Sequence, residues 1–261
     1  MSQSSRMPSA IFPDLKGKSV FITGGGSGIG ALLTESFLMQ GAHVTFIQRS
    51  DASEFCDEME AKHHERPLFI QCDILDIPAL ETALDQAKET HGPIQVLVNN
   101  AASDNRHKLE ETETDDFDHL INVNLRPHFF TAKHVAQDMA KLGGGSIINF
   151  SSIAHHLGGD QYPVYITAKA GIAGLTRALA DTLGKDNIRV NSVLPGWVFT
   201  QRQLDLWATE EKVSKHLETQ AIPEKLVSED MVGIVLFLAS DASRMLTRQS
   251  IAVDGGVIGL G

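Results

Sequence analysis

The sequence is poor in cysteine and in positive charge. Its 261 residues include two cysteines, Cys56 and Cys72, which are too far apart for a C-x-x-C motif. This spacing argues against a disulfide-stabilised scaffold, and we predict no metal site. The formal net charge is -11, because 33 acidic residues outnumber 22 lysines and arginines. Since an acidic surface repels nucleic acid and anionic lipid, neither is an expected partner.

Signal-peptide and linker segments are also missing. The chain begins with polar residues rather than the apolar core of a signal peptide, so we expect a cytoplasmic protein with reduced cysteines. Residues 1–14 are expected to form a flexible tail, and no low-complexity linker or repeat divides residues 15–261. With 42% hydrophobic and 21% charged residues, this length suits one large α/β domain.

Short apolar runs rich in β-branched residues alternate with helical segments throughout 15–261. This alternation predicts a single doubly wound Rossmann-type α/β domain, with a parallel sheet of about seven strands and helices on both faces. The ligand crevice of such a sheet lies beyond the carboxyl ends of its strands. The strands are expected near 19–23, 43–48, 67–72, 95–98, 146–151, 188–194 and 250–253.

A glycine-rich run from Thr23 to Gly30 joins the first expected strand to a helix. A helix N-terminus carries unpaired N–H groups and the positive end of the macrodipole, and glycines leave room for a phosphate to approach. Glycines also serve ordinary turns, so the run alone is weak support for a nucleotide site. Its position after the first strand favours a dinucleotide.

A second pattern, Tyr165 and Lys169, lies in an expected helix over 163–184. The four-residue spacing places both side chains on one helix face. A nearby ammonium lowers the pKa of a phenol, so Tyr165 could exchange a proton with an alcohol. The pattern is common by chance, but Ser152 ends an expected strand and points into the same crevice. Ser151 competes for this role, since alternate strand residues face opposite ways.

Asn124 lies in an expected helix over 117–142, three residues before Pro127. Proline removes a backbone donor and crowds the preceding turn, so the helix should kink or loosen there. A break beside Asn124 could hold a water that relays protons from Lys169 to solvent. The alternative is a proline tolerated in a surface helix.

Residues 201–222 form an expected helical insertion after a strand end. In that position a mobile cover would lie above the crevice, exclude water and shape the substrate pocket. An ordinary surface helix is the alternative interpretation.

Together these motifs resemble the short-chain dehydrogenase/reductase family over nearly the whole chain. The joint match is specific, and it includes the thirteen-residue interval from Ser152 to Tyr165. The matching features are T-G-x-x-x-G-x-G at Thr23 to Gly30, Asp73, Asn99-Asn100-Ala101, Asn124, Ser152, Tyr165, Lys169, Pro195-Gly196, Thr200 and Asp254-Gly255-Gly256.

The resemblance implies a nicotinamide cofactor and assigns residues to it. Asp73 would meet the adenine, Asn99 would support the adenosine side, and Lys169 would bond the nicotinamide ribose. Val198 and Thr200 would hold the carboxamide. Where many members have glycine this chain has Ala102, which should narrow the space beneath the cofactor. The residues implied to line the phosphates are Gly24, Ser27, Gly28, Ile29 and Gly30.

The choice between NAD and NADP depends on the end of the second expected strand. The position that often holds an acid for the ribose of NAD is Gln48, followed by Arg49. A cation without an acid favours a 2′-phosphate, so we expect NADP, with Arg49 and Ser50 as contacts. Asp51 could still reach the ribose of NAD, and Arg49 could be a solvated surface charge.

The expected rim of the substrate pocket is rich in hydrogen-bonding side chains, which suit a sugar better than a steroid or a long acyl chain. The tracts after Ser103, Ser152 and Pro195 resemble the aldose 1-dehydrogenase branch, as in xylose, galactose and arabinose dehydrogenases. His107 and His155 are alternatively a helix cap or loop histidines. The candidate substrate residues are Asn105, His107, His155, Gln161, Trp197 and Arg202.

The resemblance implies that Tyr165, as a phenolate, removes the anomeric hydroxyl proton while Ser152 steadies the oxygen. The product would be an aldonolactone. The expected helix around Tyr165 is apolar on several faces, so a partner subunit should cover it, and the family is often tetrameric. The alternatives are an NADPH-dependent ketoreductase acting on a polyol, hydroxysteroid or acyl thioester, and a cofactor-binding regulator without turnover.

Overall fold

A computed structural model of the chain describes residues 10–259. Within them, seven parallel strands form one sheet in the order β3-β2-β1-β4-β5-β6-β7. The doubly wound fold predicted from the sequence is confirmed. The strands are β1 (Ser19–Thr23), β2 (His43–Gln48), β3 (Leu68–Gln71), β4 (Val96–Asn99), β5 (Gly145–Phe150), β6 (Ile188–Pro195) and β7 (Ser250–Val253).

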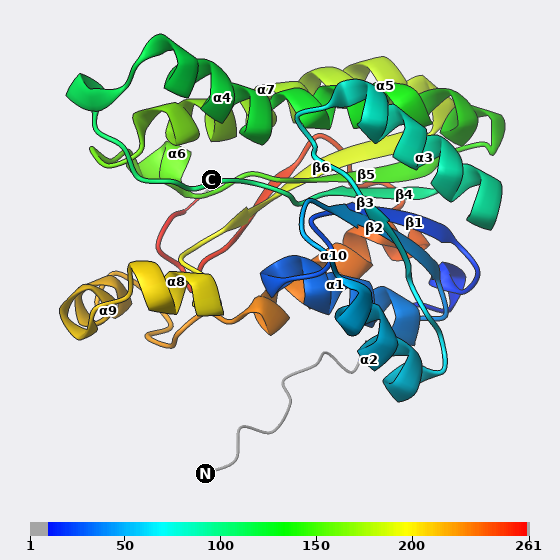
Figure 1. Cartoon of the computed structure of the whole chain (residues 1–261), viewed down its shortest axis with the longest axis horizontal. Helices are drawn as coiled ribbons and strands as arrows, with labels where there is room; N and C mark the ends of the chain where they lie inside the picture. The colour runs from blue at the N-terminus through cyan, green and yellow to red at the C-terminus, as the bar shows by residue number, and fades with distance from the viewer. Residues whose placement is uncertain (1–9, 260–261) are drawn as a thin grey trace.

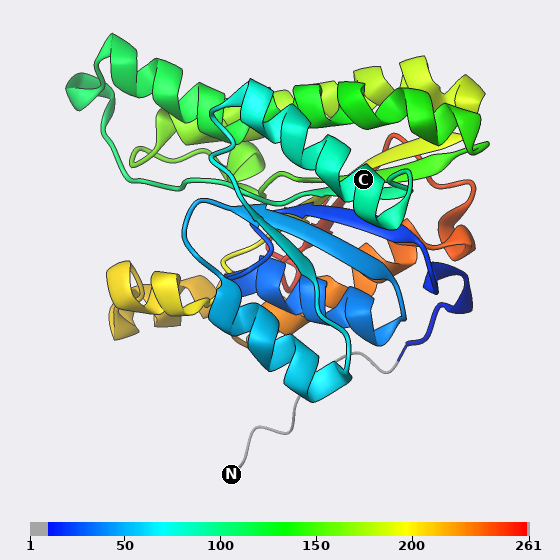
Figure 2. The same ribbon diagram turned by 45° about the vertical axis from the view of Figure 1, so that its right-hand side comes forward.

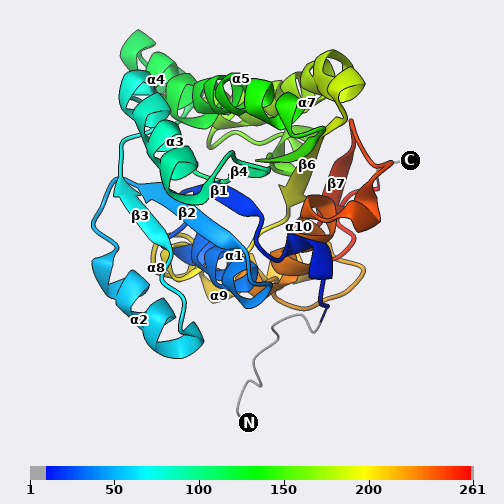
Figure 3. The same ribbon diagram turned by 90° about the vertical axis from the view of Figure 1, so that its right-hand side faces the viewer.

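Helices cover both faces of the sheet and give a three-layer molecule (Figures 1 and 3). One face carries α3 (Ile77–His91), α4 (Thr114–Asn124), α5 (Arg126–Lys141) and α7 (Pro163–Leu183), and the other carries α1 (Gly28–Met39), α2 (Ser53–His63) and α10 (Val232–Ala239). Two layers of helices explain why β1, β4 and β6 are buried at every position.

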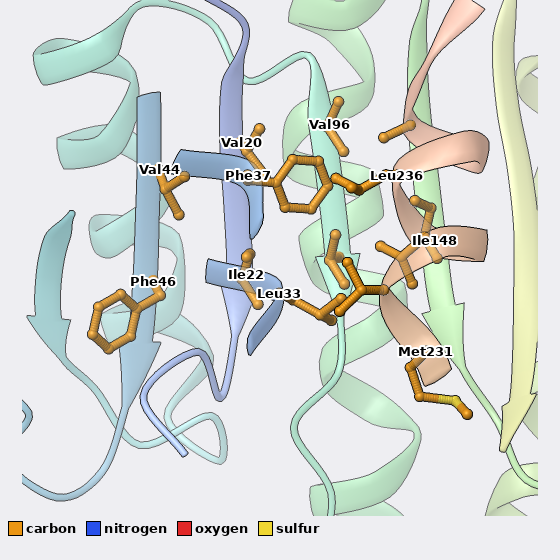
Figure 4. Packing of buried hydrophobic residues seen from close by; sticks show 14 of the residues in the cluster. Val20, Ile22, Leu33, Phe37, Val44, Phe46, Val96, Ile148, Met231 and Leu236 are labelled. Carbon is orange, nitrogen blue, oxygen red and sulfur yellow. The ribbon is translucent and has the colours of Figure 1, made fainter. Parts of the chain in front are cut away.

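The core between the sheet and α1 shows how the helix pattern is used. Leu33 and Phe37, one turn apart on α1, are fully buried and pack towards Val20 and Ile22 of β1 (Figure 4). Burial of each such side chain contributes about 1.5–3 kcal/mol to stability. A second cluster fills the opposite face, between the sheet and α3, α5 and α7. The two clusters hold the strand ends in a fixed arrangement.

The long helix expected over 117–142 is two helices. α4 ends at Asn124, α5 begins at Arg126, and Leu125 between them has non-helical dihedral angles. Pro127 lies in the first turn of α5, where its missing N–H is tolerated. The expected loosening beside Asn124 is therefore a complete break.

The first described residues are anchored to the domain. Of the expected tail, residues 1–9 lie outside the described part of the chain. Residues Pro13–Leu15 form a 3-10 turn, Leu15 is fully buried, and Asp14 accepts a hydrogen bond from the backbone of Asp241 (2.9 Å). This corrects the expected boundary at residue 15, because Pro13 and Asp14 already belong to the fold.

The insertion expected over 201–222 contains two short helices, α8 (Gln201–Leu206) and α9 (Glu210–Leu217). They extend beyond one end of the sheet (Figures 1 and 2); the small helix α6 (Ala154–Leu157) lies at the same end but on the other side of the strands (Figure 1). In residues 10–259, no helix combines the length and apolar character needed to cross a bilayer.

Candidate functional site

A cavity of about 720 Å³ opens at the carboxyl ends of the strands. Its wall comes from the glycine-rich loop after β1 and from segments that follow β4, β5 and β6, as the topology requires. The sequence-predicted residues that line it are Gly24, Ser27, Ile29, Gly30, Ser152, Gln161, Tyr165, Lys169, Trp197, Val198 and Thr200.

The glycine-rich loop contains backbone conformations with positive φ, which residues other than glycine rarely adopt. Gly24 and Gly28 have positive φ angles of 70° and 53°. A Cβ on Gly30 would lie 1.8 Å from the carbonyl oxygen of Gly24, so the loop and α1 can approach only without a side chain. Ser27 makes no side-chain cap to α1, which leaves the first-turn N–H groups available to a phosphate. This cradle fits the diphosphate of a dinucleotide.

Contacts from the end of β4 hold the loop, and the sequence interpretation had not assigned them a role. The hydroxyl of Thr23 accepts hydrogen bonds from the backbone N–H groups of Asn100 and Ala101, both at 3.0 Å. The amide of Asn100 donates to the carbonyls of Thr23 (3.1 Å) and Gly24 (3.0 Å). The Asn99-Asn100-Ala101 motif was the available signal for this support.

Three residues expected at the adenosine end lie outside the cavity wall. Arg49 and Ser50 are exposed after β2. Asp73 accepts a hydrogen bond from the N–H of Leu75 (3.0 Å). Asp51, the alternative ribose ligand, accepts from Ser53, and these hydrogen bonds lower the pKa of its carboxyl.

The side chain of Asn99 corrects one expectation. It points into the interior, where its amide donates to Asn149 (3.0 Å) and its oxygen accepts from Thr131 (2.8 Å). Asn149 in turn donates to Thr176 of α7 (3.1 Å). This buried chain links β4 and β5 to α5 and α7, so the side chain of Asn99 does not reach the adenosine end. Strand alternation determines this direction.

Ser152, Tyr165 and Lys169 lie together on the cavity wall. The hydroxyl of Ser152 is hydrogen-bonded to that of Tyr165, and the Nζ atom of Lys169 lies 5.5 Å from the centre of the Tyr165 ring. Ser151 is buried, and its hydroxyl donates to the carbonyl of Lys169 (2.7 Å). Both serines line the cavity, but only the hydroxyl of Ser152 is bonded to Tyr165.

The electrostatics of this group differ from the sequence expectation. Burial, and then the negative charge of Asp104, raise the pKa of Tyr165 well above its usual range. Burial lowers the pKa of Lys169 to about 7, and its ammonium donates to the carbonyl of Phe150 (2.8 Å). The expectation that Lys169 keeps the phenol ionised is not met, because sequence spacing indicates proximity but not desolvation.

Asn124 is fully buried and does not line the cavity. Its amide donates to the carbonyls of Ser103 (2.9 Å) and Leu120 (3.0 Å), and its oxygen accepts from the N–H of Ser103 (2.9 Å). The side chain thus positions the loop after β4.

Four of the expected substrate residues do not line the cavity: Asn105, His107, His155 and Arg202. For the two histidines, the alternative was a role as a helix cap or as loop residues. His107 accepts a hydrogen bond from the N–H of Val164 (3.1 Å) at the start of α7. His155 lies 2.6 Å from the carbonyl oxygen of Ser152 through Nδ1. The guanidinium of Arg202 donates to Asn105 (3.0 Å). These residues position the site rather than face the cavity.

The loop after β4 is joined to α8 by side chains from the polar tracts that were expected at the rim of the substrate pocket. Gln203 donates to the carboxylate of Asp104 (2.6 Å) and accepts from the indole of Trp197 (2.9 Å). One glutamine of α8 therefore connects the loop after β4 to the segment that follows β6. Their hydrogen-bonding side chains after strand ends were the only signal.

The family model adh_short_C2, described as enoyl-(acyl carrier protein) reductase, matches residues 24–258. The chain belongs to the short-chain dehydrogenase/reductase family. Its fold, its glycine-rich cradle and the Ser152, Tyr165 and Lys169 cluster agree with this membership. The protein is an enzyme, an oxidoreductase that uses a nicotinamide cofactor.

Relatives of this family cover almost the full chain. The Rhizobium meliloti (strain 1021) protein named "Probable galactose dehydrogenase GalD" is 48% identical, over 96% of this chain and 99% of its own length. The D-xylose 1-dehydrogenase of Caulobacter vibrioides (strain NA1000 / CB15N) is 45% identical over the same shares. A solved variant of a Serratia marcescens short-chain dehydrogenase/reductase has a TM-score of 0.86 at 32% identity, covering 94% of this chain and 99% of that one.

Proposed function

We propose that this enzyme oxidises C1 of an aldose to an aldonolactone. The observation that carries the proposal is a set of hydrogen-bonding side chains, Asp104, Arg106 and Gln203, that line the same cavity as Ser152 and Tyr165. Several hydrogen-bonding groups in the cavity that holds the reacting hydroxyl suit a sugar. The names of the relatives at 45% and 48% identity support the same substrate class.

The chain's own residues account for the proton in this reaction. Ser152 holds the C1 oxygen, and Tyr165 accepts its proton as the carbon–oxygen double bond forms. The nicotinamide, when bound, supplies the acceptor for the C1 hydride. Because burial raises the pKa of Tyr165, its phenolate is a strong base towards the sugar hydroxyl. Lys169 binds the nicotinamide ribose and passes the proton to a water held at the helix break after Asn124, from which it returns to solvent.

The proposed cofactor residues follow the cradle and its surroundings. The glycine-rich loop, comprising Gly24, Ser27, Gly28, Ile29 and Gly30, binds the diphosphate. Asp73 meets the adenine, and Val198 and Thr200 hold the carboxamide; the latter two line the cavity.

We infer a preference for NADP, because the exposed Arg49 and Ser50 follow β2 and the carboxylate of Asp51 is engaged by Ser53. Arg49→Ala should raise KM for NADP while changing KM for NAD little. Equal effects on both cofactors would contradict the preference.

We also propose a homotetramer in the cytoplasm. Phe117 of α4 and Phe129 of α5 are 44% and 45% exposed, and α4 packs beside α7, so a partner subunit would cover apolar surface here. Elution as a monomer from a sizing column would contradict this. The two cysteines are free, as expected for a reducing compartment.

A substrate panel tests the proposed function. The purified protein is mixed with aldoses, polyols and ketones and with each nicotinamide, while the absorbance of the reduced cofactor is followed. We expect turnover of aldoses. Activity confined to ketones would indicate a ketoreductase, and cofactor binding without any turnover would indicate a regulator.

A further inference from the structure

Arg106 lies on the cavity wall between two aromatic rings. Its guanidinium carbon is 4.0 Å from the ring centre of Tyr162 and 5.2 Å from that of Trp207. Tyr162 is the N-cap residue of α7, the helix that carries Tyr165, and Trp207 directly follows α8. The two rings hold the planar guanidinium in one orientation, so it is prepared for directional hydrogen bonds.

This guanidinium has no polar partner. Among the contacts of residues 10–259, it makes no hydrogen bond or ion pair, and its Nε atom is buried. Arg202, by contrast, bonds Asn105, and Arg189 bonds Ser243 and Ser240. Buried donors without acceptors cost free energy, and they are rare unless a ligand or water serves them.

Two further polar atoms on the cavity wall share this condition. The indole nitrogen of Trp207 and the Nε2 atom of His216 are also buried without a partner, and both residues line the cavity. Asp104 adds a carboxylate to the same wall. A ligand with several hydroxyl groups would accept from Arg106 and Trp207 and donate to this carboxylate, which also forms an ion pair with Arg202 (3.6 Å).

We propose that Arg106 is a specificity-determining residue that donates hydrogen bonds to hydroxyl oxygens of a neutral aldose, on the part of the sugar remote from C1. This inference rests on the proposed function. Burial and then Asp104 raise the pKa of Tyr165, and the charge of Arg106 opposes that increase. Arg106→Met keeps the length of the side chain but removes the donors, and Arg106→Lys keeps the charge but removes the planar fork.

Binding can be measured without turnover, because the two tryptophans of the chain, Trp197 and Trp207, both line the cavity. Their fluorescence is titrated with galactose and with deoxygalactoses that each lack one hydroxyl remote from C1. We expect the wild type to bind one deoxy analogue about 10-fold to 100-fold more weakly than galactose. Arg106→Met should bind galactose as weakly as that analogue and lose the discrimination at that position.

Matched variants separate recognition from folding. Arg244→Met removes an exposed cation outside the cavity wall and should bind galactose as the wild type does. Arg106→Lys should recover part of the affinity. The increase of kcat/KM for galactose with pH should also begin at higher pH in Arg106→Met, because the variant lacks the positive charge that lowers the pKa of Tyr165. A merely structural role of Arg106 would not produce this shift.

Three other results of the binding titrations would contradict the proposed role of Arg106. Should Arg106→Met bind galactose and its analogues as the wild type does, the inference is wrong while the aldose function stands. A wild type that binds a uronate more tightly than galactose, and loses it in Arg106→Met, would identify a carboxylate site instead. A wild type that binds no aldose would overturn the proposed function and this inference together.

Discussion

The two halves of the crevice are built in different ways. On the cofactor side, the cradle for the diphosphate is one continuous stretch after β1, from which Gly24, Ser27, Ile29 and Gly30 line the cavity. On the substrate side, side chains from the loops after β4, β5 and β6 meet, and the Asp104–Gln203 hydrogen bond joins residues 99 positions apart. The first half depends on local conformation and the second on the docking of distant segments, so they should respond differently to substitution.

The largest effect should come from substitution of Tyr165, which lies where the two halves meet. Tyr165→Phe removes the proposed proton acceptor and should lower kcat by about 100-fold to 10,000-fold. Cofactor affinity should change little, because the cradle is separate. Tyr162→Phe keeps the ring on Arg106 and should cost far less. Steady-state kinetics with galactose measure both, and equal losses would contradict the assignment.

A pH profile tests the same hydroxyl. Since the pKa of Tyr165 is raised, the phenol is protonated at neutral pH and must lose its proton to act as a base. The kcat/KM for oxidation should therefore increase about tenfold per pH unit on the acidic side of that pKa. The reverse reduction, which needs the protonated phenol, should stay level over the same range. A flat oxidation profile would remove Tyr165 from the proton step.

The cofactor half should be sensitive to a single methyl group. Gly30→Ala places a Cβ against the carbonyl of Gly24 and should destabilise the fold by about 1–3 kcal/mol and weaken cofactor binding. Gly233 of α10 has no atom within 4 Å of an added Cβ, so Gly233→Ala should be neutral or stabilising. Thermal unfolding with and without cofactor distinguishes the two.

Single substitutions in the substrate half should have smaller effects on kinetics and stability. Gln203→Leu breaks the contacts to Asp104 and Trp197, and we expect KM for the aldose to rise by about tenfold with little change in KM for the cofactor. Gln201→Leu, on the same helix but bonded only to Asp205, is the control. If both substitutions act alike, α8 has a general effect rather than a specific connection.

The sequence alone was sufficient wherever one element carries the information. Strand–helix alternation determined the parallel sheet, Pro127 indicated the break before α5, and strand-end polar residues indicated the crevice. Glycines with positive φ encode a backbone conformation in a few neighbouring residues, so the cradle after β1 was readable. The spacing of Tyr165 and Lys169 placed both on one face of α7.

Only the tertiary structure decided directions, partners and desolvation. The side chain of Asn99 points inward, His107 caps α7, and burial raises the pKa of Tyr165 where spacing alone suggested the opposite. Arg106 belongs to the polar tract that the sequence places at the substrate rim, but its position between Tyr162 and Trp207 is a property of the tertiary structure. The preferred backbone conformation of a segment depends on adjacent residues and can be predicted from them. The burial of a side chain and its hydrogen-bond partners depend on segments about a hundred positions apart, which meet only when the chain folds.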